Sequence, residues 1–278
     1  SRAQGCAQLL ELIGWFGQDV AGHRSQVCLR EKCMSSRKTA LVTGAAARIG
    51  AEICRTLHHR GCDVLLHYNS NEAAAQGLAE KLNDERANSV SIAQADLSSP
   101  AGVESLAEQT RARFGKLDIL VNNASRFYAT RAGETQAWQW DDLLNSNLRG
   151  PYFLVQALLG ELRTAGGSII NIVDIHADRP MRDHAVYCMS KAGLAMMTRA
   201  LAQELGPSIR VNGVSPGAIL WPENDPGSAE KQDVLNRTVL GRIGDPTDIA
   251  SAVAYLALDA PYVTGQILAV DGGRSLNV

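Results

Sequence analysis

The sequence predicts an α/β fold in which helices cover both faces of a doubly wound, parallel sheet of seven strands. From Lys38 onward, short apolar runs alternate with longer stretches of helical periodicity. The runs are almost continuously hydrophobic, as expected of strands that are buried on both faces of a sheet. Alternation at this spacing predicts βαβ units, in which a helix connects two parallel strands.

The expected elements follow one another without a break in composition, so we predict a single domain. Each expected strand is apolar and is bounded by polar or glycine-containing turns. The expected strands are 39–43, 63–68, 89–94, 118–122, 168–173, 209–214 and 266–270. The expected helices are 49–60, 72–85, 101–114, 138–163, 185–205 and 246–258.

Residues 1–33 differ from the rest of the chain. They hold three of the six cysteines, and Glu11 and Gly14 interrupt their one apolar patch, which makes a poor signal peptide. The segment that starts at Met34 looks like an ordinary protein start. We therefore expect 1–33 to be a disordered or non-native extension, and 34–278 to be the functional domain.

The bulk composition limits the classes of function. With 45% hydrophobic and 20% charged residues, the chain of 278 residues is typical of a soluble globular protein. The net charge of -2 argues against general affinity for nucleic acid or anionic membranes. No apolar run approaches the roughly 18 residues of a membrane span. The six cysteines form no C-x-x-C pair, which favours reduced thiols and a cytoplasmic location.

A glycine-containing turn between the first strand and the first helix, "TGAAARIG", is suited to a dinucleotide. Gly44 permits a sharp turn, and Gly50 allows close packing of the helix, whose free N–H groups can bind a pyrophosphate. Arg48 stands where a middle glycine is usual. Its guanidinium can pair with phosphate oxygens or reach over the cofactor towards a substrate, and the alternative is a solvated arginine at a helix start.

The end of the second strand, "LLHYNSNE", bears on the choice of cofactor. An NAD site usually has an acidic residue here for the ribose 2′-hydroxyl group. This sequence has the neutral residues His67, Tyr68, Asn69, Ser70 and Asn71 instead, and its first acid is Glu72. Neutral donors suit a 2′-phosphate, which a carboxylate would repel, so we predict NADP(H).

Residues 38–278 resemble the short-chain dehydrogenase/reductase family through several motifs in a fixed order. These are "TGAAARIG", "ADL" at 95–97, "NNAS" at 122–125, "NSNLRGPYF" with Asn147, the Y-x-x-x-K pair, "SPGAI" at 215–219 and the final "YVTGQILAVDGG". The resemblance implies a Rossmann-type domain that binds NADPH. The cofactor-binding residues that it implies are Gly44, Arg48, Ile49, Gly50, Tyr68, Asn69, Ser70, Asp96, Leu97, Asn123, Ala124, Ser125, Tyr187, Lys191, Pro216, Gly217 and Ile219.

The family pattern makes Tyr187 the proton donor. Lys191 follows one turn later on the same helix face, where its charge is expected to lower the pKa of the phenol and its ammonium to hold the nicotinamide ribose. Asn147 is expected to bind a water that links the lysine to solvent. The alternative for the pair is a coincidental tyrosine and lysine on a helix.

Asp174 stands where carbonyl-reducing members of the family have a serine. A carboxylate would repel a developing oxyanion, whereas the reduction of a C=N bond needs a proton at nitrogen, which an acid paired with Tyr187 can manage. Alternatively, Asp174 only caps a helix or orients Tyr187. Phe127 is expected to stack on a flat ring, with loop packing as the alternative.

Within the family, the chain is most similar to the pteridine reductases. "GAAARIG", "LLHYNS", "NNASRFY", "NIVD" and "VDGGRSL" carry this likeness. It implies NADPH-dependent reduction of pterins such as dihydrobiopterin or dihydromonapterin, and possible use of dihydrofolate. The substrate-binding residues implied are Arg48, Ser125, Phe127, Asp174 and Tyr187. A carbonyl or 3-oxoacyl-thioester reductase and a non-catalytic NADP-binding regulator are the alternatives.

The resemblance also implies a homotetramer and a substrate lid around 220–240, whose prolines restrict its hinges. "DIHAD" at 174–178 has acids and a histidine, but no second cluster supports it as a metal site. We therefore expect a small-molecule substrate and no metal, nucleic acid or membrane partner.

Overall fold

The computed structural model of the protein describes residues 37–221 and 227–277. The predicted extension at 1–33 lies outside the described residues, as do residues 222–226 of the predicted lid. None of the helices in the described ranges is long and apolar enough to cross a membrane.

The seven-stranded sheet is confirmed, and its strands are all parallel. They run in the order β3-β2-β1-β4-β5-β6-β7. Each predicted strand coincides with an observed one to within two residues. The strands are β1 (Thr39–Val42), β2 (Asp63–Tyr68), β3 (Val90–Gln94), β4 (Ile119–Asn122), β5 (Ser168–Ile172), β6 (Arg210–Pro216) and β7 (Ile267–Val270).

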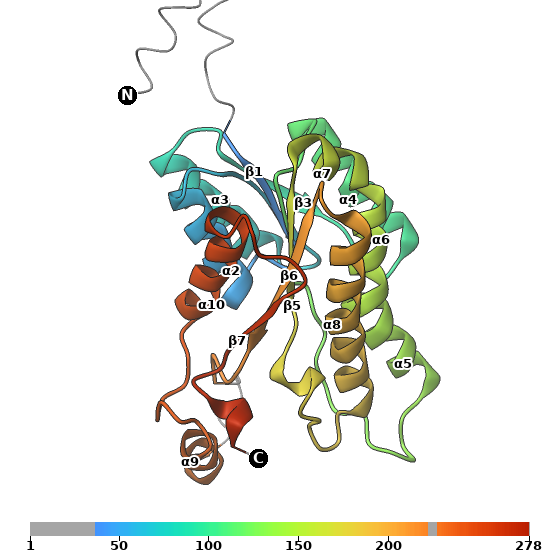
Figure 1. Ribbon diagram of the computed structural model, residues 1–278, viewed down its shortest axis with the longest axis vertical. Helices are drawn as coiled ribbons and strands as arrows, with labels where there is room; N and C mark the ends of the chain where they lie inside the picture. The colour runs from blue at the N-terminus through green and yellow to red at the C-terminus, as the bar shows by residue number, and fades with distance from the viewer. Residues whose placement is uncertain (1–36, 222–226, 278) are drawn as a thin grey trace, which may run out of the picture. The chain divides into compact units, whose positions relative to one another are not determined.

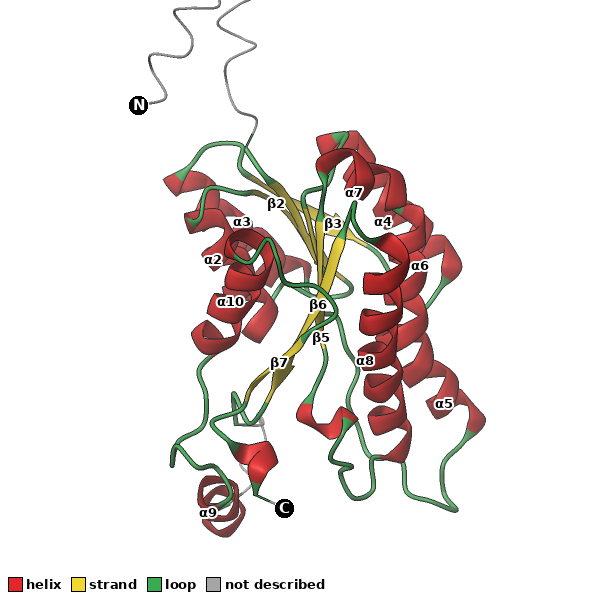
Figure 2. Ribbon diagram, in the orientation of Figure 1, coloured by secondary structure: helices red, strands yellow, loops and turns green. Residues whose placement is uncertain are grey.

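Helices cover both faces of the sheet, as a single Rossmann-type domain requires (Figure 1, Figure 2). One face carries α2 (Arg48–His59), α3 (Glu72–Glu85) and α10 (Pro246–Ala254), which continues as the π-helix η3 (Tyr255–Asp259). The other face carries α4 (Pro100–Phe114), α6 (Gly150–Ala157), α7 (Leu159–Ala165) and α8 (Ala185–Leu205). The remaining elements are α5 (Ala137–Leu144), α9 (Ser228–Asn236), the π-helix η1 (Asn145–Arg149) and the 3₁₀ helices η2 (Ile175–Ala177) and η4 (Arg274–Leu276).

The core lies in two layers, one on each side of the sheet. Along β1, Ala40 and Val42 pack into the layer under α2, while Leu41 packs into the layer under α8, and all three are fully buried. Side chains alternate between the two faces of a strand. Because both faces are buried, most positions are apolar, which explains the nearly continuous hydrophobic runs in the sequence.

One expectation about helices was wrong. The stretch 138–163 is not one helix: a π-turn widens it at Asn145–Arg149, and Leu158, with φ -104° and ψ 11°, separates α6 from α7. The helix α9, which was not among the expected helices, lies within the predicted lid, and the lid itself stays a prediction. None of the α9 side chains is buried. A helix without a buried face needs no apolar stripe, and so the sequence shows no helical periodicity to recognise there.

A buried polar chain ties α8 to the sheet. The Asn122 amide donates to Oδ1 of Asn171 at 2.8 Å, and the Asn171 amide donates to Oγ1 of Thr198 at 2.8 Å. Thr198 in turn donates to the Leu194 carbonyl at 2.8 Å. Because a buried amide needs a partner, this chain fixes where α8 lies on β4 and β5.

We expect Thr198→Val to destabilise the protein, because valine keeps the shape of threonine but leaves the Asn171 amide without an acceptor. An orphaned buried donor costs about 1–3 kcal/mol. Thr110→Val is the matched control, since Thr110 is equally buried and donates to the carbonyl four residues earlier at 2.7 Å, without accepting from another side chain. Urea unfolding measures both, and equal losses of stability would contradict the proposed anchoring.

Candidate functional site

A groove runs along the carboxyl ends of the strands, where the sheet reverses its direction of winding between β1 and β4. Open α/β sheets bind their ligands at such a switch point. The groove consists of two cavities of ≈ 400 Å³ and ≈ 480 Å³. Both are lined by Arg48, Ile49, Asn123 and Ser125, so they meet at the turn after β1 and the turn after β4.

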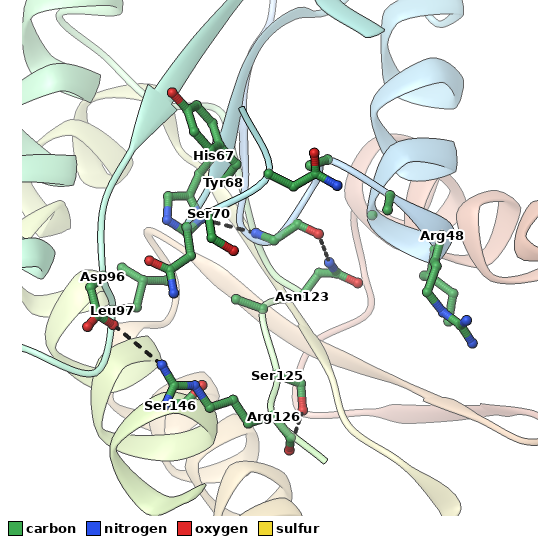
Figure 3. A pocket seen from close by; sticks show the side chains of 18 of the residues that line it. Arg48, His67, Tyr68, Ser70, Asp96, Leu97, Asn123, Ser125, Arg126 and Ser146 are labelled. Carbon is green, nitrogen blue, oxygen red and sulfur yellow. Dashed lines mark hydrogen bonds and ion pairs between the residues drawn. The ribbon is translucent and has the colours of Figure 1, made fainter. Parts of the chain in front are cut away.

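Every predicted site residue except Asn147 lines this groove. Besides the four shared residues, the first cavity is lined by Gly44, Gly50, Tyr68, Asn69, Ser70, Asp96, Leu97 and Ala124 (Figure 3). The second cavity is lined by Phe127, Asp174, Tyr187, Lys191, Pro216, Gly217 and Ile219. The structure therefore brings together the residues expected to bind a dinucleotide in one cavity and those expected at the reaction centre in the other.

The two glycines of the first turn have the geometry that the sequence suggested. Gly44 has φ +62°, and a Cβ there would lie 2.7 Å from the Cα of Ala124. A Cβ on Gly50 would lie 2.4 Å from the Gly44 carbonyl oxygen. A side chain at either position would therefore push the turn, the helix and the β4 end apart.

The N-terminus of α2 is open towards the groove. Its cap residue, Ala47, makes no side-chain hydrogen bond, and the first turn contains no acidic residue. Its N–H groups and the positive end of the helix dipole are thus available to the phosphates of a dinucleotide. This arrangement fits the cofactor that the sequence predicted.

Arg48 occupies a left-handed backbone conformation, with φ +54°. That conformation is natural for glycine and costs other residues about 1 kcal/mol or more. The Arg48 side chain is exposed and has no hydrogen bond or ion pair with the described residues. In Figure 3 it extends away from His67 and Tyr68. The guanidinium is free to contact a ligand in either cavity, and it is not positioned by the protein alone.

His67 is a positioning residue that we did not predict. Its Nδ1 accepts a hydrogen bond from the Gly44 N–H at 3.0 Å, and its Nε2 lies 3.0 Å from the Ala95 carbonyl oxygen. These partners require a neutral ring with the proton on Nε2. Burial lowers the pKa of His67 and keeps it neutral. In the sequence it was only one of several neutral residues at the end of β2.

Thr43 and Asn123 join the two turns. Oγ1 of Thr43 accepts from the backbone N–H groups of Asn123 at 2.9 Å and Ala124 at 3.0 Å. The Asn123 amide donates to the carbonyl oxygens of Thr43 at 2.8 Å and Gly44 at 2.9 Å. The side chain of Asn123 therefore holds the first turn in place from the end of β4, as well as lining both cavities.

Asp174 and Tyr187 form a direct hydrogen bond in the second cavity. The Tyr187 hydroxyl donates to Oδ2 of Asp174 at 2.6 Å. Oδ1 of Asp174 accepts from the His176 N–H at 2.8 Å, which caps η2. One carboxylate oxygen thus performs the capping that we considered as an alternative, and the other faces the tyrosine.

The electrostatics of the pair differ from the expectation that Lys191 lowers the pKa of Tyr187. Burial raises the pKa of Tyr187, and the carboxylate of Asp174 raises it further. The Lys191 ammonium lies 5.8 Å from the centre of the tyrosine ring and donates to the Ile172 carbonyl at 3.0 Å. Burial lowers the pKa of Lys191 to about 8, against the opposing effect of Asp174. The phenol is therefore neutral, while the ammonium remains mostly charged at neutral pH.

Asn147 is buried behind the groove, within the π-turn η1. Its Oδ1 accepts from the Arg126 N–H at 2.7 Å and from Oγ of Ser125 at 3.2 Å. Its amide donates to the Arg126 carbonyl at 2.9 Å and to Oγ of Ser190 at 3.1 Å. These four bonds use the full capacity of the side chain. Asn147 positions the loop after β4, and its water relay stays a prediction.

Phe127 has an exposed ring at the mouth of the second cavity. Its side chain is 55% exposed, so it is not core packing. The ring meets the Tyr187 ring edge-on, with centroids 4.8 Å apart, and lies parallel to the His184 ring at the same distance. The stacking with His184 and the contact with Tyr187 keep the ring at the entrance, where a flat ligand can contact it.

Two arginines in the groove were not among the predicted residues. Arg126 lies in the first cavity, 4.0 Å from Oδ1 of Asp96, and also pairs with Asp142 (Figure 3). Arg274 lines the second cavity and donates to the Val234 carbonyl at 3.1 Å. Both belong to motifs that carried the likeness to the pteridine reductases, "NNASRFY" and "VDGGRSL". Nothing in a short motif indicates which side chain faces the groove.

Comparison with known proteins identifies the family. A family model described as "Enoyl-(Acyl carrier protein) reductase" matches residues 44–275. The chain belongs to the short-chain dehydrogenase/reductase family. It is 37% identical over 240 residues to the uncharacterized oxidoreductase YmfI of Bacillus subtilis, covering 85% of this chain and 98% of the relative.

Two further relatives differ in their named activities. Pteridine reductase 1 of Leishmania tarentolae is 36% identical over 277 residues, covering 85% of this chain and 96% of the relative. The 3-oxoacyl-[acyl-carrier-protein] reductase FabG of Staphylococcus aureus is 35% identical over 244 residues, covering 86% and 99%. The protein is thus an NAD(P)-dependent reductase of this family.

We expect His67→Leu to weaken NADPH binding about tenfold, which corresponds to about 1.4 kcal/mol. Leucine leaves the Gly44 N–H and the Ala95 carbonyl without their partner, so the first turn loses its fixed position. His67→Gln is the control, because an amide can both accept and donate. Fluorescence titration with NADPH measures the affinity, and equal affinities in the wild type and His67→Leu would refute the positioning by His67.

Acid should destabilise the protein through the same histidine. In the unfolded chain a histidine takes up a proton below about pH 6.5, whereas the pKa of buried His67 is lowered in the fold. The unfolded state therefore binds more protons, and stability falls as the pH drops below that of the unfolded group. We expect the free energy of unfolding, measured with urea, to fall less between about pH 7.5 and 5.5 in His67→Gln than in the wild type.

Proposed function

We propose that the protein is an NADPH-dependent reductase of pterins, of the dihydrobiopterin or dihydromonapterin kind, with dihydrofolate as a further candidate substrate. The observation that carries the proposal is the hydrogen bond of 2.6 Å between the Tyr187 hydroxyl and the Asp174 carboxylate. Both groups line the second cavity, whose entrance carries the exposed ring of Phe127.

The Asp174 carboxylate favours reduction of a C=N bond over reduction of a C=O bond. Reduction of a ketone or thioester carbonyl develops negative charge on oxygen, and Asp174 would repel that charge. Reduction of a C=N bond in a pterin instead requires a proton at the ring nitrogen. A carboxyl group that shares a hydrogen bond with a phenol is suited to deliver that proton.

Some residues of this chain are proposed to bind the cofactor, and others to protonate the substrate. NADPH, when bound, supplies the hydride. Lys191 holds the nicotinamide ribose hydroxyls, and the N-terminus of α2 holds the phosphates. The proton of the 2.6 Å hydrogen bond belongs to the Tyr187 hydroxyl, and the pair is proposed to relay a solvent proton through this bond to the ring nitrogen. The His176 N–H, which donates to the other oxygen of Asp174, keeps the carboxylate in place.

Phe127 and Arg48 are proposed to recognise the flat substrate. A pterin ring stacked on Phe127 would gain about 1 kcal/mol. Ser125 is proposed to contact the edge of the pterin. The strained backbone of Arg48 supports a function for its side chain, because glycine would avoid the strain. Its guanidinium would contact either the cofactor phosphates or the substrate.

The preference for NADPH is proposed from the end of β2. Tyr68, Asn69 and Ser70 line the first cavity and bring neutral donors to it. Asp96 accepts from the N–H and hydroxyl of Ser98, which lower its pKa, and is proposed to hold the adenine. Arg126, which pairs with Asp96 and Asp142, brings a guanidinium to this cavity, and a guanidinium is suited to a 2′-phosphate.

A 3-oxoacyl-thioester reductase is the second candidate, because a relative with that name is almost as similar as the pteridine reductase. A non-catalytic NADP-binding regulator is disfavoured, since tyrosine, lysine and asparagine all stand at the positions of the family motif.

We also propose a homotetramer in the cytoplasm. The exposed apolar side chains on helices α5, α6 and α8 support an assembly, and they are Trp138, Trp140, Tyr152, Phe153, Met189 and Met196. The three described cysteines are free thiols, which supports a reducing location.

A substrate panel tests the proposal directly. We expect dihydrobiopterin to be turned over with a higher kcat/KM than an acetoacetyl thioester, and NADPH to be preferred over NADH by at least about tenfold. Consumption of reduced cofactor followed at 340 nm measures all four combinations. Faster turnover of the thioester would refute the pterin assignment and favour the second candidate.

We expect Asp174→Ser to lower kcat for the pterin by about 100-fold or more, the usual contribution of a positioned acid, with little change in NADPH affinity. Asp178→Ser is the matched control, because Asp178 is exposed and lines neither cavity. Tyr187→Phe should lose turnover and still bind NADPH. If Asp174→Ser kept its pterin turnover, the carboxylate would have no part in protonation.

A further inference from the structure

Three side chains of metal-ligating types meet where α2 and α3 end, at the opposite end of α2 from the turn after β1. His58 and His59 end α2, and Glu85 is the last residue of α3. One ligand atom from each of the three lies within 4.8 Å of the others. Neither the family motifs nor the two cavities of the groove include these residues, and no metal was expected from the sequence.

His58 is the most informative member of the cluster, because its hydrogen bonds fix its tautomer. The side chain is 2% exposed, and Nε2 lies 2.8 Å from Oγ of Ser89. That hydroxyl donates its own proton to the Arg86 carbonyl, so it accepts from His58. The proton of the neutral His58 ring is therefore on Nε2, and Nδ1 carries a lone pair.

The lone pair of His58 faces a carboxylate. Nδ1 is buried, has no hydrogen-bond partner among the described residues and lies 3.8 Å from Oε2 of Glu85. Two acceptors that face each other across this distance leave room for a cation between them.

His59 completes the set from the solvent side. Its Nε2 lies 3.0 Å from the same Glu85 oxygen, and its side chain is exposed. In addition, both α2 and α3 end at the cluster, so the negative ends of two helix dipoles converge on it. These dipoles and the Glu85 carboxylate favour a positive charge at this position.

We propose that His58 Nδ1, His59 Nε2 and Glu85 bind a divalent transition metal, with Zn²⁺ as the best fit. Two imidazoles and one carboxylate are a common zinc set, and a water would complete the tetrahedron. The bond from His58 to Ser89 is the kind of outer contact that orients a zinc-bound histidine. The metal would have to displace only the hydrogen bond between His59 and Glu85.

The proposed metal joins α2 to α3 and takes no part in the reaction. The twelve residues of α2 span about 18 Å, which separates the cluster from the cofactor turn. Arg86 is a nearby cation, but its guanidinium donates to the backbone carbonyls of His58 and Cys62 and does not occupy the cluster. The site is therefore a clamp between two helices on one face of the sheet.

Isothermal titration of the full, metal-free chain with Zn²⁺ tests the proposal, alongside thermal unfolding. We expect one Zn²⁺ per chain at this cluster and a rise in Tm of about 5 °C at saturation. His59→Gln and Glu85→Gln should each weaken this binding by at least about tenfold. Both side chains are exposed, so the variants should fold, and NADPH binding checks that they do.

Asp84→Asn is the matched control, since it removes the same charge one residue away on α3 without touching the cluster, and it should bind Zn²⁺ as the wild type does. Cysteines 6, 28 and 33 are present in every variant, so binding through those thiols would survive both substitutions. Binding that is unchanged in His59→Gln and Glu85→Gln, or no binding by the wild type, would overturn the proposal.

Discussion

The close approach of the turn after β1 to the turn after β4 is the constraint on which the rest of the site depends. Gly44 lies so near Ala124 that a Cβ would clash, and Asn123 binds two carbonyl oxygens of the first turn. This contact fixes where α2 begins and therefore where its N–H groups point. It also lies between two cavities that share four lining residues, Arg48, Ile49, Asn123 and Ser125, so that one extended ligand can occupy both.

The reaction centre depends on how α8 is held against this frame. The buried chain from Asn122 through Asn171 to Thr198 anchors α8 to the two central strands, and Asn147 ties the π-turn to the loop after β4. These polar contacts are directional, unlike the apolar packing around them, so they specify one position of the helix. Tyr187 thereby meets Asp174 at hydrogen-bonding distance without either residue leaving its own element.

The strands and the groove could be predicted because they follow from patterns that are local in sequence. Strands buried on both faces are mostly apolar, and motif residues lie at strand ends, which a parallel sheet gathers on one edge. The π-turn and α9 have no such pattern. The bonds of His67 to Gly44 and Ala95 were missed because they depend on side-chain directions between distant segments. The effect of Lys191 on Tyr187 was misjudged because burial raises the pKa of the phenol, and Asp174, which lies closer than the lysine, raises it further.

Helix α2 has a proposed ligand site at each end, and the helix dipole favours both ligands. Its N-terminus opens onto the first cavity, where a pyrophosphate is proposed, and its C-terminus carries the His58 cluster, where a cation is proposed. An anion at the first end and a cation at the second each stabilise the same row of aligned peptides. The dipole falls off within a turn of each end, so the two ligands would act separately on one rigid element. The two ligands together are then expected to stabilise α2, while the chemistry of the reaction stays with Asp174 and Tyr187 in the second cavity.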